Sequence, residues 1–139
     1  MFSNARRRRI LIVDDQPQIL QLYSRVLDRA GYDTQTALDA ERALHMIQVA
    51  APDGVFVDLR MPFINGVGLL YRLRFLYPDL PAAIITGESN LNGETAKEVA
   101  TLGAALHFKP LSNTEVEQVA SELLARPARF GAGSVPAVR

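Results

Sequence analysis

The sequence predicts an α/β fold in which helices cover both faces of a parallel β-sheet. Two observations support this fold class. Four short runs of the chain are apolar at nearly every position, which is typical of strands buried on both faces of a parallel sheet. Segments with apolar residues at helical spacing separate these runs, so strand and helix patterns alternate along the chain.

The strands are predicted at the apolar runs and at one more polar segment. Residues 33–37, Asp-Thr-Gln-Thr-Ala, alternate in character and suit an edge strand, which is less buried than a central one. The four apolar runs are residues 10–13, 55–57, 82–85 and 104–108.

The helix boundaries are indicated by residues that favour helix ends. Pro17 suits a first helical turn and Gly31 suits the position just past a helix end, which predicts a helix over residues 17–30. Asp39 suits an N-cap, and Ser112 with Glu115 forms a capping-box pattern, so a helix is expected to follow each. Two further helices are predicted over residues 66–77 and 94–102. In the first of these, the stripe Leu69, Leu70, Leu73 and Leu76 is expected to be core.

Length and composition are those of one globular domain. The 139 residues, of which 48% are apolar and 22% charged, are sufficient to bury one hydrophobic core. The formal net charge of zero argues against a nucleic-acid binder, whose surface is usually strongly basic. The absence of cysteine excludes disulfides, thiolate catalysis and cysteine metal sites.

No segment of the sequence is expected to enter a membrane. No apolar run is long enough to cross a bilayer. The apolar residues 10–13 follow a basic run at residues 6–9 but end at once in Asp14 and Asp15, which is too short for a signal peptide. We therefore expect a cytoplasmic protein whose arginine run is a solvated leader. Contact of that run with nucleic acid or a membrane is the minor alternative.

Polar side chains follow four of the predicted strands. Asp14 and Asp15 follow the first strand, Asp58 follows the third, Thr86 the fourth and Lys109 the fifth. In an open parallel sheet, ligands bind beyond the carboxyl ends of the strands. Three carboxylates, one hydroxyl and one ammonium are therefore expected to meet at one rim of the sheet.

This set of groups predicts phosphoryl transfer assisted by a divalent cation. Clustered carboxylates repel one another unless a cation neutralises them, and an oxygen-only ligand set suits Mg²⁺. A carboxylate can attack phosphorus, while Lys109 supplies a charge for one phosphate oxygen and Thr86 a hydrogen bond for another.

Several short motifs, in this order, resemble the response-regulator receiver domain of two-component signalling. The resemblance extends from about residue 9 to residue 125, and most of the motifs stand at the end of a predicted strand. The motifs are Asp14-Asp15-Gln16-Pro17, Asp58-Leu59-Arg60-Met61-Pro62, Gly66, Thr86-Gly87 and Lys109-Pro110. The resemblance implies a flavodoxin-like fold, a doubly wound five-stranded parallel sheet in the order 2-1-3-4-5 flanked by five helices.

The resemblance also implies a metal site. Asp15 would bind Mg²⁺ directly, and Asp14 would act mostly through water. Asp58 and the backbone carbonyl of Arg60 would complete the protein ligands.

The resemblance assigns the phosphoryl chemistry to three residues. Asp58 would be the phosphoacceptor, and Lys109, preceding Pro110 across a cis peptide bond, would contact the phosphoryl group. Thr86 would move toward the phosphoryl group and drive the switch.

Three positions near the site modulate this pattern or depart from it. The family often has Tyr or Phe three residues before the lysine, where this chain has Leu106. The side chains of the next two residues, His107 and Phe108, should point in alternate directions along the strand. Arg60 and Glu88 stand where the family tunes hydrolysis of the phosphoryl group. Their opposite charges motivate the hypothesis that they form an ion pair over the site and slow the attack of water.

The resemblance divides the chain into a receiver domain at residues 9–126, a flexible basic leader at 1–8 and a flexible Gly-, Pro- and Ala-rich tail at 127–139. No second domain is expected. The predicted function is therefore that of a single-domain response regulator, similar to stand-alone chemotaxis regulators, with self-catalysed phosphoryl transfer and slow autodephosphorylation.

The expected partners are proteins. A sensor histidine kinase or a histidine phosphotransfer protein would donate the phosphoryl group, and an unidentified output protein would receive the signal. A homodimer is a further option, and no nucleic-acid partner is expected. The alternative function is a phosphorylation-independent pseudo-receiver that serves as a protein-binding module. A Mg²⁺-dependent phosphate-ester hydrolase is disfavoured, because the chain has no room for a cap domain over a substrate.

Overall fold

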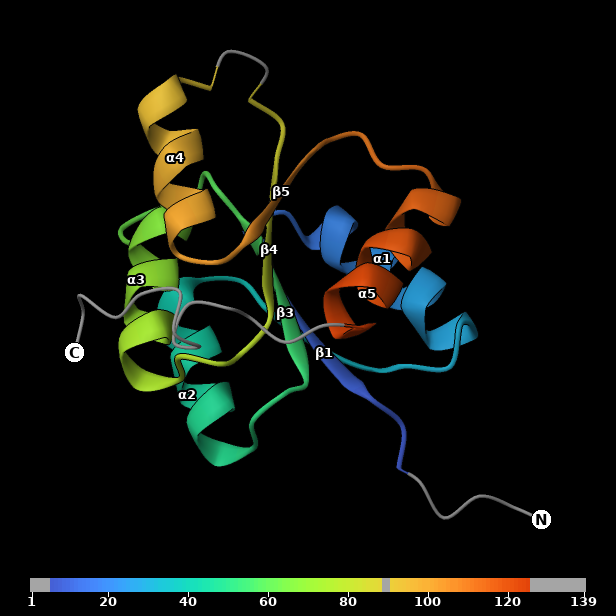
Figure 1. The fold of residues 1–139 in the computed structure, drawn as a ribbon. Coiled ribbons are helices and arrows are strands. Elements are labelled where there is room, and N and C mark those ends of the chain that lie inside the picture. The colour runs from blue at the N-terminus through green and yellow to red at the C-terminus, as the bar shows by residue number, and fades with distance from the viewer. Residues whose placement is uncertain (1–5, 89–90, 126–139) are drawn as a thin grey trace.

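The computed structural model describes residues 6–88 and 91–125, and within them it confirms the predicted α/β class. Strands and helices alternate from β1 to α5 (Figure 1). The strands are β1 (Arg9–Val13), β2 (Asp33–Ala37), β3 (Gly54–Asp58), β4 (Ala82–Thr86) and β5 (Ala105–Phe108). The helices are α1 (Pro17–Arg29), α2 (Ala40–Val49), α3 (Gly66–Leu76), α4 (Gly93–Thr101) and α5 (Asn113–Ala125). The predicted tail and the first five residues of the predicted leader lie outside the described residues.

The five strands form one parallel sheet in the order β2-β1-β3-β4-β5, which confirms the predicted order. The polar segment predicted as an edge strand is β2, and it lies at one edge of the sheet. Because all strands run the same way, their carboxyl ends lie along one edge, where β1, β3, β4 and β5 are consecutive neighbours.

The helices lie in two layers, α1 and α5 on one face of the sheet and α2, α3 and α4 on the other (Figure 1). Successive strand residues point to opposite faces. In β1, Leu11 and Val13 accordingly join the core under α2 to α4, while Ile10 and Ile12 join the core under α1 and α5. A strand with a buried face on each side must be apolar throughout, which explains the continuous apolar runs.

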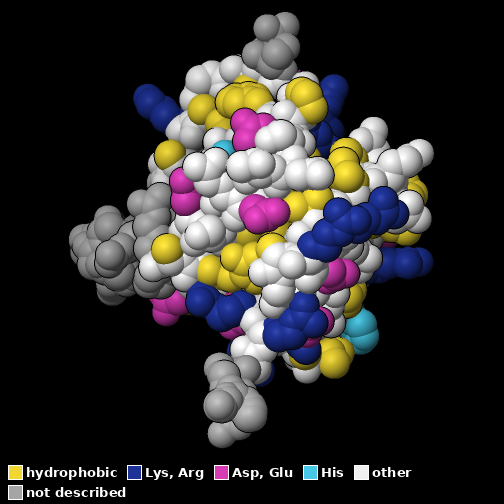
Figure 2. All heavy atoms as spheres, turned by 90° about the vertical axis from the view of Figure 1, so that its right-hand side faces the viewer, with side chains coloured by type: hydrophobic (Ala, Val, Ile, Leu, Met, Phe, Trp, Pro, Cys, Tyr) yellow, Lys and Arg dark blue, Asp and Glu magenta, His cyan; other side chains and the backbone are white. Residues whose placement is uncertain are grey.

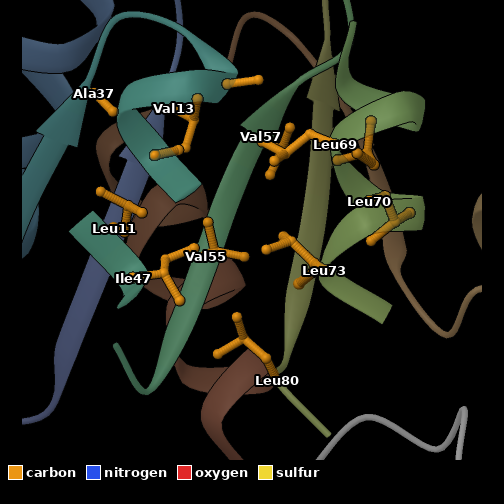
Figure 3. Packing of buried hydrophobic residues seen from close by; sticks show 14 of the residues in the cluster. Leu11, Val13, Ala37, Ile47, Val55, Val57, Leu69, Leu70, Leu73 and Leu80 are labelled. Atoms are coloured by element: carbon orange, nitrogen blue, oxygen red, sulfur yellow. The ribbon is translucent and has the colours of Figure 1, made fainter. Parts of the chain in front are cut away.

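The core on the α2–α4 side contains most of the predicted leucine stripe (Figure 3). Leu69, Leu70 and Leu73 are fully buried against β3 and its neighbours. Leu76 was expected to belong to this core, and that expectation is wrong, because its side chain is 53% exposed. Leu76 is the last residue of α3, so the helix ends before the stripe reaches another buried turn.

The predicted helix caps are present. The side chain of Asp39 accepts a hydrogen bond from the Arg42 amide at 2.8 Å. Ser112 and Glu115 form the reciprocal capping box, with distances of 2.8 Å and 3.1 Å. Gly31 has a φ of 101°, a left-handed conformation that favours glycine after a helix end.

Three arginines of the predicted leader are exposed but hydrogen-bonded to the folded domain. Arg6 makes two contacts with the Asp53 carboxylate, at 3.1 and 3.2 Å. Arg7 donates to carbonyls just after α1, and Arg8 donates to the Leu124 carbonyl near the end of α5 at 2.8 Å. Helix C-termini attract positive charge, so Arg7 and Arg8 stabilise the ends of α1 and α5.

The face of the molecule that α1 and α5 cover carries charges of both signs (Figure 2). On the face covered by α1 and α5, acidic and basic side chains lie interspersed among neutral and apolar ones (Figure 2). In the part of the chain that the structure describes, no helix has the length and apolar character needed to cross a bilayer.

Candidate functional site

The predicted acidic residues meet at the carboxyl edge of the sheet. Asp14 directly follows β1, and Asp58 is the last residue of β3, the neighbour of β1. Asp14, Asp15 and Asp58 each offer a carboxylate oxygen, and the three oxygens lie within 4.8 Å of one another. Asp14 and Asp58 are buried, whereas Asp15 is exposed. The parallel topology thus brings together carboxylates from two strands that are far apart in the sequence.

Lys109 joins this cluster from the end of β5. Its Nζ lies 2.9 Å from Oδ2 of Asp14 and 3.2 Å from Oδ1 of Asp58, and its side chain is 15% exposed. The Lys109 amide donates to the Thr86 carbonyl at 2.8 Å, which fixes the start of the turn after β5. The predicted cis peptide bond between Lys109 and Pro110 is present.

The two oxygens of Asp14 are both engaged within the chain. Oδ1 accepts a hydrogen bond from the Gln16 amide at 2.9 Å, and Oδ2 faces Lys109. Asp15, by contrast, is open to solvent at the rim of the cluster. The two neighbouring carboxylates therefore differ in how freely they could bind a ligand.

Burial and like charge raise the pKa of Asp58. Desolvation is the largest cause, the charge of Asp14 adds to it, and Lys109 opposes both, so that the pKa of Asp58 rises to about 6. Burial alone would lower the pKa of Lys109. Its contacts with Asp14 and Asp58 outweigh burial, so the pKa of Lys109 is raised. A single ammonium thus contacts two of the three clustered carboxylates, and a hard divalent cation held by oxygen ligands would neutralise the excess negative charge.

The β3–α3 loop closes tightly over the end of β3. The Gly66 amide donates to the Leu59 carbonyl at 2.9 Å, so the loop returns to its own starting point. A Cβ added at Gly66 would lie 2.5 Å from the Asp58 carbonyl oxygen and 2.8 Å from Cα of Leu59. Only glycine fits this approach without a shift of the backbone that carries Asp58.

Arg60 and Glu88 form the predicted ion pair. Nη1 of Arg60 lies 3.2 Å from Oε2 of Glu88, with side-chain exposures of 69% and 36%. Both residues line an open groove of about 860 Å³ that also includes Asp15, Met61 and Thr95. The ion pair connects the β3–α3 loop to the residues after β4, at the side of the acidic cluster.

Thr86 is fully buried at the end of β4, the strand beside β3. Its Oγ1 accepts a hydrogen bond from the Glu88 amide at 3.1 Å. The hydroxyl keeps its own proton as a donor for another group. Every residue predicted for the site from a strand end therefore lies at the same edge of the sheet.

Comparison with known families identifies the domain. The profile of the response regulator receiver domain matches residues 10–121, which is most of the chain. The chain belongs to this family. Receiver domains interact with histidine kinases or phosphotransfer proteins and generally depend on Mg²⁺, and the acidic cluster has the ligand types for such a site.

The relatives of this receiver domain include chains of very different lengths. It is 32% identical over 117 residues to sporulation initiation phosphotransferase F of Bacillus subtilis, a match that covers 84% of this chain and 93% of that protein. It is 31% identical over 88 residues to the transcriptional regulatory protein PrrA of Mycobacterium leprae, where the match covers 63% of this chain and 38% of the regulator. The receiver domain thus spans only part of the length of several relatives.

Solved structures with a similar fold include a chemotaxis protein and another receiver domain. Chemotaxis protein CheY4 of Vibrio cholerae has a TM-score of 0.79 at 29% identity, and the match covers 85% of this chain and 99% of that one. The receiver domain of NtrX from Brucella abortus has a TM-score of 0.77 at 34% identity, and the match covers 84% of this chain and 98% of that one.

Leu106 stands where the resemblance leads us to expect an aromatic side chain. Leu106 is partly buried and packs against the core on the α2–α4 side. Strand alternation puts Phe108 on the same face as Leu106 and His107 on the opposite face. Phe108 pairs with Thr86 in the β4–β5 register and is 48% exposed. Phe108 therefore lies beside Thr86 in the sheet, a position that spacing along the chain did not predict.

Proposed function

We propose that this receiver domain accepts a phosphoryl group on Asp58 from a phosphohistidine of a partner protein and works as a single-domain response regulator. One observation carries the proposal. The buried Asp58 carboxylate lies within 3.2 Å of the Lys109 ammonium and in one cluster with Asp14 and Asp15. A nucleophile, a cation for a phosphate oxygen and the ligands of a metal ion are therefore in one place.

Asp58 would act as the nucleophile in its ionised form. A pKa of about 6 leaves the carboxylate mostly ionised at neutral pH, yet makes it more basic than an exposed aspartate. One of its oxygens forms a bond to phosphorus, the P–N bond of the phosphohistidine breaks, and the imidazole leaves with the electron pair.

The other side chains would neutralise and orient the phosphoryl group. Lys109 would turn from Asp58 toward a phosphoryl oxygen, and the Thr86 hydroxyl would donate a hydrogen bond to another. Asp15, Asp58 and the Arg60 backbone carbonyl would hold Mg²⁺, and Asp14 would act mostly through water. A bound Mg²⁺ supplies charge neutralisation at the transferring phosphoryl group. The exposure of Asp15 and the contacts of Asp14 with Lys109 and Gln16 support this division of roles.

The Arg60–Glu88 ion pair would set the lifetime of the phosphorylated state. It lies beside the cluster, in the groove through which water can approach. Holding both side chains over the site would slow the attack of water on the acyl phosphate.

The signal would leave through protein contacts or by transfer of the phosphoryl group to a further protein. The likeness to sporulation initiation phosphotransferase F, of which the match covers 93%, supports action without an attached output domain. The donor would be a sensor histidine kinase or a histidine phosphotransfer protein in the cytoplasm. We further propose that the receiver domain spans residues 9–126. Two copies of it would form a homodimer.

The second candidate is a pseudo-receiver that binds its partner without phosphorylation. Leu106 favours it, because the aromatic side chain that often couples to the threonine is replaced by an aliphatic one. This candidate predicts a domain that neither binds Mg²⁺ nor accepts a phosphoryl group.

Intact mass after incubation with acetyl phosphate and Mg²⁺ tests the proposal. The wild type should gain one phosphoryl group, and the gain should disappear in Asp58→Asn and in EDTA. Asp79→Asn, at an exposed position before β4, is the matched control and should be phosphorylated like the wild type. Absence of both phosphorylation and Mg²⁺ binding by calorimetry would instead support the pseudo-receiver.

A further inference from the structure

Phe63, in the β3–α3 loop, combines two unfavourable features. It has a φ of 67°, and it is the single non-glycine residue with positive φ among residues 6–88 and 91–125. Its side chain is fully exposed, with a relative accessibility of 102%. Glycine or asparagine adopts this backbone conformation at lower cost than a bulky aromatic residue. The ring has no packing within the described chain that would offset the strain.

An exposed apolar residue by itself needs no explanation. Phe75, on the outer face of α3, is 86% exposed and lies in ordinary helical backbone. Phe63 differs because its backbone is strained as well, at a position where the tight loop requires left-handed backbone but no aromatic ring. Folding stability therefore does not account for the phenylalanine, which suggests a contact outside the chain.

The position of Phe63 indicates what that contact is. A Cβ at Gly66 would lie 2.5 Å from the Asp58 carbonyl oxygen, so Gly66 is next to the backbone of Asp58. Gly66 is three positions after Phe63, which keeps their Cα atoms within about 11 Å of each other. Met61, Pro62 and Asn65, on either side of Phe63, line the groove beside the acidic cluster.

A protein donor must cover this loop. Transfer requires the phosphorus to come within about 3.5 Å of the Asp58 carboxylate. A protein that binds specifically covers about 800 Å² of its partner, which corresponds to a disc of about 16 Å radius. A disc of that size centred on Asp58 reaches Phe63. A small donor such as acetyl phosphate has no such footprint.

We propose that the ring of Phe63 is a docking contact for the phosphohistidine-bearing donor protein and seats in an apolar patch beside its histidine. This inference rests on the proposed function, because it assumes transfer to Asp58. Exposed aromatic rings are frequent energetic anchors of protein interfaces, and binding would bury a ring that the free domain leaves in water.

The test compares two kinds of donor on three variants. The protein donors are the purified histidine kinases and histidine phosphotransfer proteins of the source organism, each phosphorylated on histidine, and the small donor is acetyl phosphate. Phe63→Ala should lower the second-order rate constant of transfer from the protein donor about ten-fold. The same variant should load from acetyl phosphate within about two-fold of the wild type, which also shows that it is folded.

Two controls separate docking from stability. Phe75→Ala removes another highly exposed ring, from α3, and should leave both reactions unchanged. Phe63→Gly should raise the melting temperature, because it releases backbone strain, and should still slow transfer from the protein donor.

The outcomes distinguish this inference from the proposed function. Equal transfer from protein donors to wild type and Phe63→Ala would overturn the docking role of Phe63. A wild type that loads from acetyl phosphate but from no phosphohistidine protein would overturn it as well. Failure of the wild type to load from either kind of donor would instead overturn the proposed function.

Discussion

The ammonium nitrogen of Lys109 lies 3.2 Å from Oδ1 of Asp58, although the two residues come from opposite sides of β4 in the sheet. Both side chains are largely buried, with exposures of 15% and 7%. The same ammonium contacts Asp14 at 2.9 Å. One cation thus holds two buried carboxylates together, and this arrangement leads to the first prediction.

Replacing Lys109 with methionine should destabilise the metal-free domain. The change leaves Asp14 and Asp58 buried and facing each other without a cation, which should lower the free energy of unfolding by about 3 kcal/mol at neutral pH. Urea unfolding in EDTA measures this change. Lys97→Met is the control, because Lys97 is exposed on α4. Equal loss of stability in both variants would contradict the assignment of the effect to the cluster.

The raised pKa of Asp58 should make the metal-free domain less stable as the pH rises. Between the ordinary aspartate pKa of 3.8 and the folded value of about 6, the folded protein holds a proton that the unfolded chain has released. The contribution of Asp58 to stability is therefore present below about pH 4 and is lost as the pH rises through about 6.

Asp58→Asn isolates this contribution. In EDTA at neutral pH the variant should be more stable than the wild type by about 2 to 3 kcal/mol, and the difference should vanish near pH 4. Urea unfolding of both proteins across this range is the measurement. A difference that does not change with pH would be inconsistent with a raised pKa at Asp58. Mg²⁺ added at neutral pH should stabilise the wild type more than the variant.

Breaking the Arg60–Glu88 ion pair should shorten the lifetime of the phosphorylated domain with little effect on stability. The pair is largely exposed, so its loss should change the free energy of unfolding by less than about 1 kcal/mol. Arg60→Ala should accelerate hydrolysis about five-fold, which corresponds to about 1 kcal/mol in the barrier. The decay of the phosphoprotein by intact mass gives the rate.

Arg42→Ala is the matched control for that experiment. Arg42 forms an ion pair with Asp39 whose side-chain exposures, 69% and 36%, equal those of Arg60 and Glu88, but it lies at the start of α2. Its loss should not affect hydrolysis. An unchanged lifetime in Arg60→Ala would rule out a role of the ion pair in excluding water.

Gly66→Ala should disturb the acceptor site through the backbone. The new Cβ would lie 2.5 Å from the Asp58 carbonyl oxygen, and a backbone atom cannot move aside as a flexible side chain can. We expect a loss of about 1 to 3 kcal/mol in the free energy of unfolding, with slower phosphorylation by acetyl phosphate.

Gly93→Ala provides the comparison for Gly66. Gly93 opens α4, and an added Cβ there meets nothing within 4 Å. This substitution should be neutral or stabilise the domain by up to about 1 kcal/mol. If the two alanine variants unfolded at the same urea concentration, the tight approach at Gly66 would not be the cause.

Most of the fold followed from local patterns in the sequence. The apolar runs predicted four strands to within one residue at either end, because a strand covered on both faces must be apolar throughout. The caps at Asp39 and at Ser112 with Glu115 could be predicted because each hydrogen bond joins residues three apart. The exposure of Leu76 could not be predicted, because helical spacing does not reveal where a helix extends beyond the elements that cover it.

The side-chain contacts of the leader were a second point that local patterns did not reveal. A run of arginines predicts a solvated segment, yet Arg7 and Arg8 donate to carbonyls near the ends of α1 and α5. Those helix ends come next to the start of β1 only when the sheet is assembled. Phe108 is a similar case, because its pairing with Thr86 depends on the β4–β5 register.

The sequence by itself determined the fold class, the strand ends that carry Asp14, Asp58, Thr86 and Lys109, and through their motifs the family. These features depend on residue type and on spacing along the chain. The tertiary structure decided that Lys109 contacts both Asp14 and Asp58, that the pKa of Asp58 rises to about 6, and that Phe63 is exposed in left-handed backbone. These properties depend on distance, burial and backbone angles, which are fixed only when strands far apart in the sequence become neighbours in one sheet.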